Sequence, residues 1–188
     1  MSKILRTALL SILLVTVTFS GCGVIQQISE MPDLAPPCPH LFASITVNDA
    51  AVCVMRDYYT VDGVRTPLTV NQARAVAAEN GWSLPTRELV DAIWAAADCR
   101  LEPITMPPTA AMTTPDYALR HHSLIEEQLF HSEYQSCNII AGHKKDVLAD
   151  GSIYGWHTIM GNPIQPVSWI HGDNYADYSH GIRFIINE

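Results

Sequence analysis

The sequence is short of positive charge and lacks the motifs of several common metal and redox sites. Its 188 residues include 11 lysines and arginines against 19 aspartates and glutamates, a formal net charge of −8. So acidic a chain is a poor partner for nucleic acid or for the anionic phosphate surface of a membrane. No CxxC pair is present, which argues against a zinc ribbon or a thioredoxin-type site, and HExxH is absent too.

The chain has one long apolar run, Thr7–Phe19, which is too short to span a bilayer as a permanent helix. Lys3 and Arg6 flank its start, and the letters FSGC follow at residues 19–22. This order of basic region, apolar core, small residues and cysteine resembles a bacterial lipoprotein signal, with phenylalanine where leucine is usual. The resemblance implies removal of residues 1–21 and acylation of Cys22. An ordinary secretory peptide with a chance cysteine is the alternative.

Lipid chains on Cys22 would attach the protein to a membrane. Gly23 stands after this cysteine, where no aspartate is present, and by resemblance to Gram-negative lipoproteins this implies the outer membrane, with the protein facing the periplasm. Residues 22–40 contain four prolines with little periodicity and are predicted to be a tether. Residues 41–188 then form one domain of a size that can bury a core.

Four further cysteines, Cys38, Cys53, Cys99 and Cys137, give an even number in an exported chain. This predicts two disulfides, whose connectivity has three possibilities. The alternative is a catalytic thiol, for which Cys137 in the triplet Ser136-Cys137-Asn138 is the candidate.

Local patterns predict an α+β fold in a single domain, with helices in the middle and short antiparallel strands mainly in the C-terminal half. Residues 51–60 and 64–68 flank the turn Asp62-Gly63 and are interpreted as a hairpin. A capping box at 69–72 predicts a helix that ends at Asn80-Gly81, and further helices are expected from Thr86 and from Thr114 to Phe130. In the second helix, a buried stripe of Leu89, Val90, Ile93, Trp94 and Ala97 is expected. Short strands are predicted at 137–141, 146–149, 152–157, 166–170 and 181–186, with turns at 150–151 and 161–163.

Seven of the eight histidines fall between His121 and His180. Histidine is the side chain best suited to carry protons or bind metal near neutral pH. His122 and Glu126, four residues apart, fit an exposed pair on one face of a helix as well as they fit a metal site. The run Gly142–Asp146 places Lys144 and Lys145 beside His143, which makes either a local positive site or a solvated loop.

Alternation along a strand that begins near Tyr178 puts His180 on the apolar face with Ile182, Phe184 and Ile186. We therefore expect His180 to be at least partly buried and to need a partner, which Asp173, Tyr175 or Asp177 could supply. Either His180 is a satisfied core histidine or it is an oriented acid or base.

Two resemblances concern this region. His171-Gly172 and Ser179–Arg183 resemble the HG and SHGCxR motifs of L,D-transpeptidases, but Ile182 replaces the nucleophilic cysteine, so the thiol chemistry is absent. The order LPTRELVDAIW, HHSLIEEQ, AGHKKDV, YGWH, PIQPVSWIHG and YADYSHGIRFI is similar to domains of uncharacterised secreted bacterial proteins. This second resemblance spans residues 68–186, implies one folding unit and brings no activity.

Two functions follow. The first is a hydrolase of an envelope polymer such as peptidoglycan, in which His143, His171 and His180 act as bases or bind one zinc ion. Asp146 or Asp177 would orient an imidazole or complete the metal shell. The groups expected to contact substrate are Lys144, Arg183, Tyr175, Trp156 and His157, with Trp169 a further exposed aromatic. The second is a non-catalytic outer-membrane lipoprotein that binds a protein or glycan partner.

Overall fold

The chain builds two sheets from short strands far apart in the sequence, in a computed structural model that describes residues 37–131 and 136–187. The predicted lipoprotein signal, Cys22 and most of the tether lie outside these residues. The described residues belong to one compact unit, and their mixed α+β fold is a single domain. Within the described ranges, no helix is both long and apolar enough to cross a membrane.

The first sheet is antiparallel and has the order β1-β2-β11, formed by Phe42–Val47, Ala50–Met55 and Ile185–Asn187. The second has the order β10-β7-β8-β9, formed by His180–Gly181, Lys145–Val147, Ile153–His157 and Pro163–Ser168. Two small ladders pair β3 (Thr60–Val61) with β4 (Val64–Arg65) and β5 (Cys99–Arg100) with β6 (Ile140–Ala141). Most pairs are antiparallel, as predicted, but β10 pairs with β7 and β5 pairs with β6 in parallel.

The three predicted helices are present as α1 (Val70–Asn80), α2 (Arg87–Ala96) and α3 (Pro115–His131), with a short 3-10 helix at Ala110–Thr113. Thr69 and Gln72 form the predicted capping box of α1, and Gly81 ends that helix in the left-handed conformation. Thr86 caps α2. These helix boundaries therefore lie where the capping residues predict them. In the predicted buried stripe of α2, Trp94 is only partly buried.

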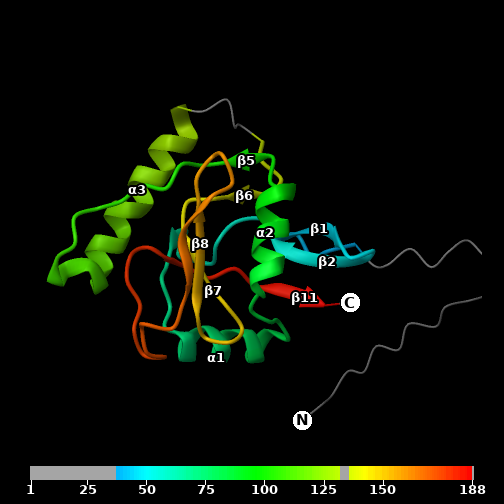
Figure 1. Cartoon of the computed structure of the whole chain (residues 1–188), viewed down its shortest axis with the longest axis horizontal. Coiled ribbons are helices and arrows are strands. Elements are labelled where there is room, and N and C mark those ends of the chain that lie inside the picture. The colour runs from blue at the N-terminus through cyan, green and yellow to red at the C-terminus, as the bar shows by residue number, and fades with distance from the viewer. Residues whose placement is uncertain (1–36, 132–135, 188) are drawn as a thin grey trace, which may run out of the picture. The chain divides into compact units, whose positions relative to one another are not determined.

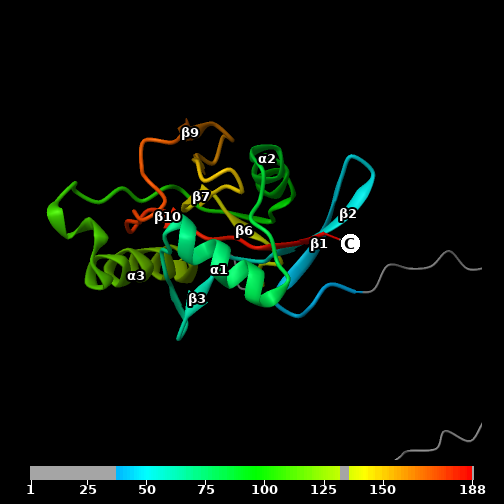
Figure 2. The same ribbon diagram turned by 90° about the horizontal axis from the view of Figure 1, so that it is seen from below.

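The two faces of the first sheet are covered by different helices. Alternate strand residues point to opposite faces. One face packs Phe42, Cys53 and Phe184 with α1, and the other packs Ile45, Val54 and Ile185 with α2. Figure 1 shows α1 along one edge of the unit and the β1–β2 hairpin and α3 at opposite ends, with β7 and β8 between them. Figure 2, seen from below, also shows α3 and the β1–β2 hairpin at opposite ends, with α1 between them in this view.

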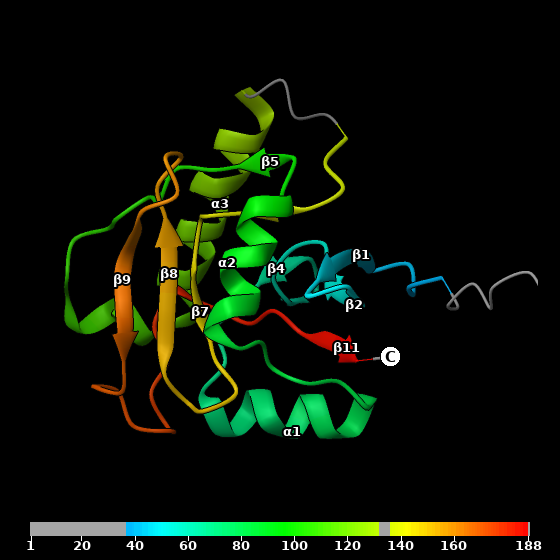
Figure 3. The same ribbon diagram turned by 45° about the vertical axis from the view of Figure 1, so that its right-hand side comes forward.

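The strand pairing near the N-terminal side of the domain differs from the prediction. The predicted hairpin of residues 51–60 with 64–68 forms only next to its turn, where Thr60 pairs with Arg65. Residues 50–55 instead form β2, which pairs with β1 through a turn at Asn48 and Asp49, both of which have positive φ. The Asp62-Gly63 turn is present, but it joins only the short strands β3 and β4. Pro163, predicted in a turn, begins β9, an edge strand where a missing N–H is tolerated. Figure 3 shows β9 beside β8.

The four cysteines form the disulfides Cys38–Cys53 and Cys99–Cys137, which confirms the predicted number of disulfides and selects one of the three connectivities. Cys53 belongs to the core of the first sheet, and Cys99 begins β5. Cys137 is therefore bonded, and the alternative of a free catalytic thiol is not supported.

Candidate functional site

Three of the predicted site residues come together on the segment that leads into β10. One ligand atom from each of His171, Asp177 and His180 lies within 4.8 Å of the others. We call these three residues the His171–Asp177–His180 cluster. His180 is 2% exposed and Asp177 is 2% exposed, while His171 is half-buried. The cluster therefore has two members inside the protein and one at its surface.

The parallel pairing of β10 with β7 fixes His180. In this ladder His180 lies opposite Lys145, and Gly181 lies opposite Asp146. A Cβ on Gly181 would lie 2.6 Å from Lys144 Cβ and 2.6 Å from the ring of Tyr58, so only glycine allows this approach. His180 is buried, as the alternation argument predicts. Ser179 and Arg183, which alternation places on the opposite face, are buried as well, so both faces of this segment are covered.

The carboxylate of Asp177 is held on both oxygens. Its Oδ1 accepts hydrogen bonds from the backbone N of Ser179 at 2.8 Å and from the Ser179 hydroxyl at 2.6 Å, and its Oδ2 accepts one from the Tyr175 hydroxyl at 3.0 Å. The Tyr175 ring also stacks on His171, with centroids 4.2 Å apart. Tyr175 thus restrains both Asp177 and His171, the two groups that flank His180.

The imidazole of His180 has no hydrogen-bond partner in the part of the chain that the structure describes, although both of its ring nitrogens are buried. Burial lowers the pKa of His180 to about 4, despite the opposing effect of Asp177. Burial also raises the pKa of Asp177, but His180, the Ser179 hydrogen bonds and Lys145 outweigh it, and the net pKa is lowered. At neutral pH the cluster therefore contains a neutral imidazole and an ionised carboxylate.

A polar groove begins beside the cluster. Tyr175 lines a hollow of ≈ 390 Å³, together with Pro67, Thr69, Gln72, Thr113, Asn174 and Ala176. Pro67 and Thr113 also line a second hollow of ≈ 170 Å³ that continues toward Arg65. The side chains along this groove are mostly small and hydrogen-bonding, which suits an extended polar chain better than a flat apolar ligand.

His143 belongs to a different group from His171 and His180. Its Nε2 lies 3.1 Å from Asp57 Oδ1, and its ring meets the edge of Tyr58. Asp57 also pairs with Arg65, and the pKa of Asp57 is held far below its usual range because His143 and Arg65 outweigh the effect of burial. The pair His122 and Glu126 on α3 contacts the same arginine, so it serves Arg65 and not a metal ion.

Asp146 faces Tyr58 from the other side. The Tyr58 hydroxyl donates to Asp146 Oδ2 at 2.9 Å, and Arg183 Nε lies 3.8 Å from Oδ1. Burial raises the pKa of Asp146 to about 6, with Arg183 opposing the shift. His143 and Asp146 therefore converge on one residue, Tyr58, because residues 142–144 bend before β7 begins. We call Asp57, Tyr58, Arg65, His143, Lys144, Asp146 and Arg183 the buried polar network.

Several residues expected to contact substrate lie inside the protein. Arg183 donates to the backbone oxygens of Met55 and Ile140, each at 2.7 Å, and is 1% exposed. Lys144 is fully buried and donates to the Tyr178 backbone oxygen. Neither cation can reach a macromolecular substrate, because each is used to satisfy buried backbone carbonyls.

Trp156 and His157 are also buried, and they lie on the β8 side of the second sheet. Lys145 Nζ lies 5.0 Å from the Trp156 ring centre, and His157 Nε2 lies 3.1 Å from Asp91 on α2. The Tyr154 hydroxyl donates to the same carboxylate at 2.8 Å. Of the predicted substrate contacts, Tyr175 alone lines the groove.

Sequence reasoning missed Asp57, Tyr58 and Arg65. They lie on and beside a predicted strand, and nothing in their local pattern distinguishes them from surface residues. Asp57 stands 86 residues before its partner His143, so only the tertiary structure joins them.

No protein-family model, curated protein or solved structure matches this chain.

Proposed function

We propose that this protein is a lipid-anchored cell-envelope hydrolase that acts on an envelope polymer such as peptidoglycan, with the His171–Asp177–His180 cluster as its reacting centre. The supporting observation is the buried His180 imidazole, whose two nitrogens lack partners beside an ionised carboxylate and a second imidazole. A buried polar group without a partner costs about 1–3 kcal/mol, which a purely structural histidine would not need to sustain.

Hydrolysis adds water across the scissile bond, so the site must hold a water molecule and accept one of its protons. The neutral His180 imidazole and the carboxylate of Asp177 offer lone pairs for that purpose. The adjoining groove would hold the polymer, with Thr69, Gln72 and Asn174 available to hydrogen-bond peptide or sugar groups. The predicted anchor at Cys22 and the predicted tether would keep the site within reach of an insoluble polymer.

The test is release of soluble fragments from purified peptidoglycan, followed by liquid chromatography and mass spectrometry. His171→Ala removes a half-buried ring and should leave the fold intact while lowering the rate at least about 100-fold. His40→Ala, an exposed histidine far from the cluster in the sequence, is the matched control and should keep the full rate. If the unaltered protein releases no fragments, with or without added zinc, the hydrolase proposal fails.

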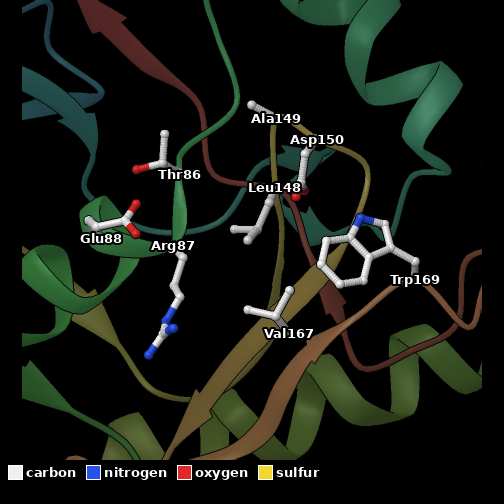
Figure 4. A pocket seen from close by; sticks show the side chains of 8 residues that line it. All are labelled: Thr86, Arg87, Glu88, Leu148, Ala149, Asp150, Val167 and Trp169. Atoms are coloured by element: carbon white, nitrogen blue, oxygen red, sulfur yellow. The ribbon is translucent and has the colours of Figure 1, made fainter.

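The second candidate function, a non-catalytic binder of a glycan or protein, is favoured by a separate pocket of ≈ 310 Å³. Figure 4 shows Trp169 and Arg87 on opposite sides of it, with Leu148 and Val167 between them. The Trp169 side chain is 64% exposed, unusual for so large an apolar group, and an exposed indole face stacks well on sugar rings or prolines. Binding to peptidoglycan without fragment release, lost in Trp169→Ala, would support this alternative.

A further inference from the structure

The structure assigns a transition-metal site to the His171–Asp177–His180 cluster, and we infer that the protein binds one zinc ion there. This inference deepens the proposed function, because it names what the reacting centre would hold. It does not depend on hydrolysis, since metal binding can be measured by itself.

The donor set fits zinc in kind and number. Two imidazoles and one carboxylate are ligands that zinc accepts, whereas calcium and magnesium prefer sites made of oxygen alone. Their ligand atoms lie within 4.8 Å of one another, so small side-chain adjustments bring all three to the distance of about 2 Å at which zinc is bound. Three protein ligands leave a fourth position for water, which is the arrangement of catalytic zinc sites.

The unpartnered nitrogens of His180 give independent evidence for a ligand. Elsewhere in the protein, buried histidines are engaged: His143 Nε2 meets Asp57, and His121 Nε2 lies 2.9 Å from the Ile104 backbone oxygen. Among the described residues, His180 is the histidine whose two ring nitrogens are both buried and both without a hydrogen bond. An ion between His180, His171 and Asp177 would satisfy one of them.

The surroundings of Asp177 resemble those that orient a metal ligand. Ser179 and Tyr175 hold the carboxylate from both sides, and Tyr175 also stacks on His171. Hydrogen bonds of this kind fix the direction of a ligating carboxylate, and their loss typically weakens metal binding 10–100-fold. Tyr175→Phe keeps the stacked ring but removes the hydrogen bond, so it should weaken zinc binding by about that factor.

The positive charges of Lys144 and Lys145 oppose the binding of a cation, because both act on the His171–Asp177–His180 cluster. Both contribute to lowering the pKa of His180. Burial lowers the pKa of Lys144 itself to about 7, which reduces its positive charge at neutral pH. An anion such as phosphate is the competing occupant that these lysines would favour, and the experiment must separate the two.

The test uses the full chain expressed with its leader, extracted in detergent and freed of metal with a chelator. Zinc titration against a chromophoric competitor should give one site per chain. Cobalt(II) in place of zinc should give the visible absorption of a four- or five-coordinate ion. His171→Ala and Asp177→Asn should each abolish this absorption and weaken zinc binding at least about 100-fold, while His40→Ala should change neither.

The inference is overturned if the metal-free protein binds no zinc, if His171→Ala binds it as tightly as the original, or if inorganic phosphate binds at the cluster in place of zinc. The two proposals fail separately. Zinc binding without fragment release leaves the metal site standing and removes the hydrolase. Fragment release that is unaffected by the chelator keeps the hydrolase and removes the metal.

Discussion

Around α1, α2 and the first sheet the interior is filled by aliphatic and aromatic side chains, whereas around Tyr58 and β7 it is filled by ionisable ones. The first region follows from hydrophobic burial, which is the dominant favourable term in folding. The second contains a lysine and an arginine that are almost fully buried, whose transfer from water is unfavourable unless each is paired. A well-packed apolar core would do the structural work of the second region at least as well. The second interior is therefore held by hydrogen bonds and ion pairs, and it should be more sensitive than the first to the loss of a single polar partner.

Arg183→Met is expected to have the largest effect, because it breaks the buried polar network at its centre. The change leaves two backbone oxygens unpaired and Asp146 without its positive neighbour. Removing one partner of a buried ion pair costs about 3–5 kcal/mol. Urea denaturation followed by circular dichroism measures it. Arg74→Met, at the exposed pair with Asp173, should cost less than about 1 kcal/mol. Equal losses in the two variants would contradict the comparison.

Removal of each disulfide tests the stability of the region whose interior is aliphatic and aromatic. The Cys99–Cys137 bond joins residues 38 apart and the Cys38–Cys53 bond joins residues 15 apart. Loop-closure entropy predicts losses of about 3.9 and about 3.0 kcal/mol when each pair is replaced by alanine. Thermal unfolding under non-reducing conditions gives the order of stability. In the native protein, an alkylating reagent should modify none of these four cysteines. Modification of Cys137 would instead indicate a free thiol that could act as a nucleophile.

Lys144→Met tests the region of ionisable side chains through the pH dependence of its folding stability. Burial lowers the pKa of Lys144 from 10.5 to about 7. Between these values the unfolded chain binds a proton that the folded chain has released, so stability rises with pH. The slope from this group is about 1.4 kcal/mol per pH unit, or roughly 2–3 kcal/mol between pH 7 and pH 9. Urea denaturation at both pH values should show this rise in the original protein and lose it in Lys144→Met. Parallel pH profiles would show that the amine titrates normally.

Trp169→Ala should have the smallest effect on folding. The side chain is 64% exposed, and a substitution at such a surface position changes stability by about 0.5 kcal/mol or less. A measurable change in peptidoglycan co-sedimentation with unchanged stability would place a binding role at the pocket in Figure 4. A large loss of stability would instead make Trp169 a structural residue.

Features with local causes could be predicted from the sequence. The caps of α1 and α2 depend on side chains within a few residues of each helix end, and the cysteine count predicted two disulfides. The β1–β2 turn was missed because Asn48 and Asp49 both adopt positive φ without the glycine that usually marks such a turn.

The candidate site could be predicted only in part. Its members His171, Asp177 and His180 lie close together in the sequence, so their grouping was visible. The burial of Lys144 and Arg183 was not, because charged side chains are expected at the surface and their partners come from distant segments. The separation of His143 from the cluster likewise depends on Asp57, which only the folded chain brings near it.

Residues 180–187 supply one strand to each of the two sheets, β10 and β11, and between them Arg183 reaches Met55, 128 residues earlier. Contacts of such sequence separation form slowly, because a long loop must close first. A chain that ends at residue 179 can complete neither sheet and lacks His180. Premature termination or proteolytic trimming before this point would thus disable the fold and the site in a single event.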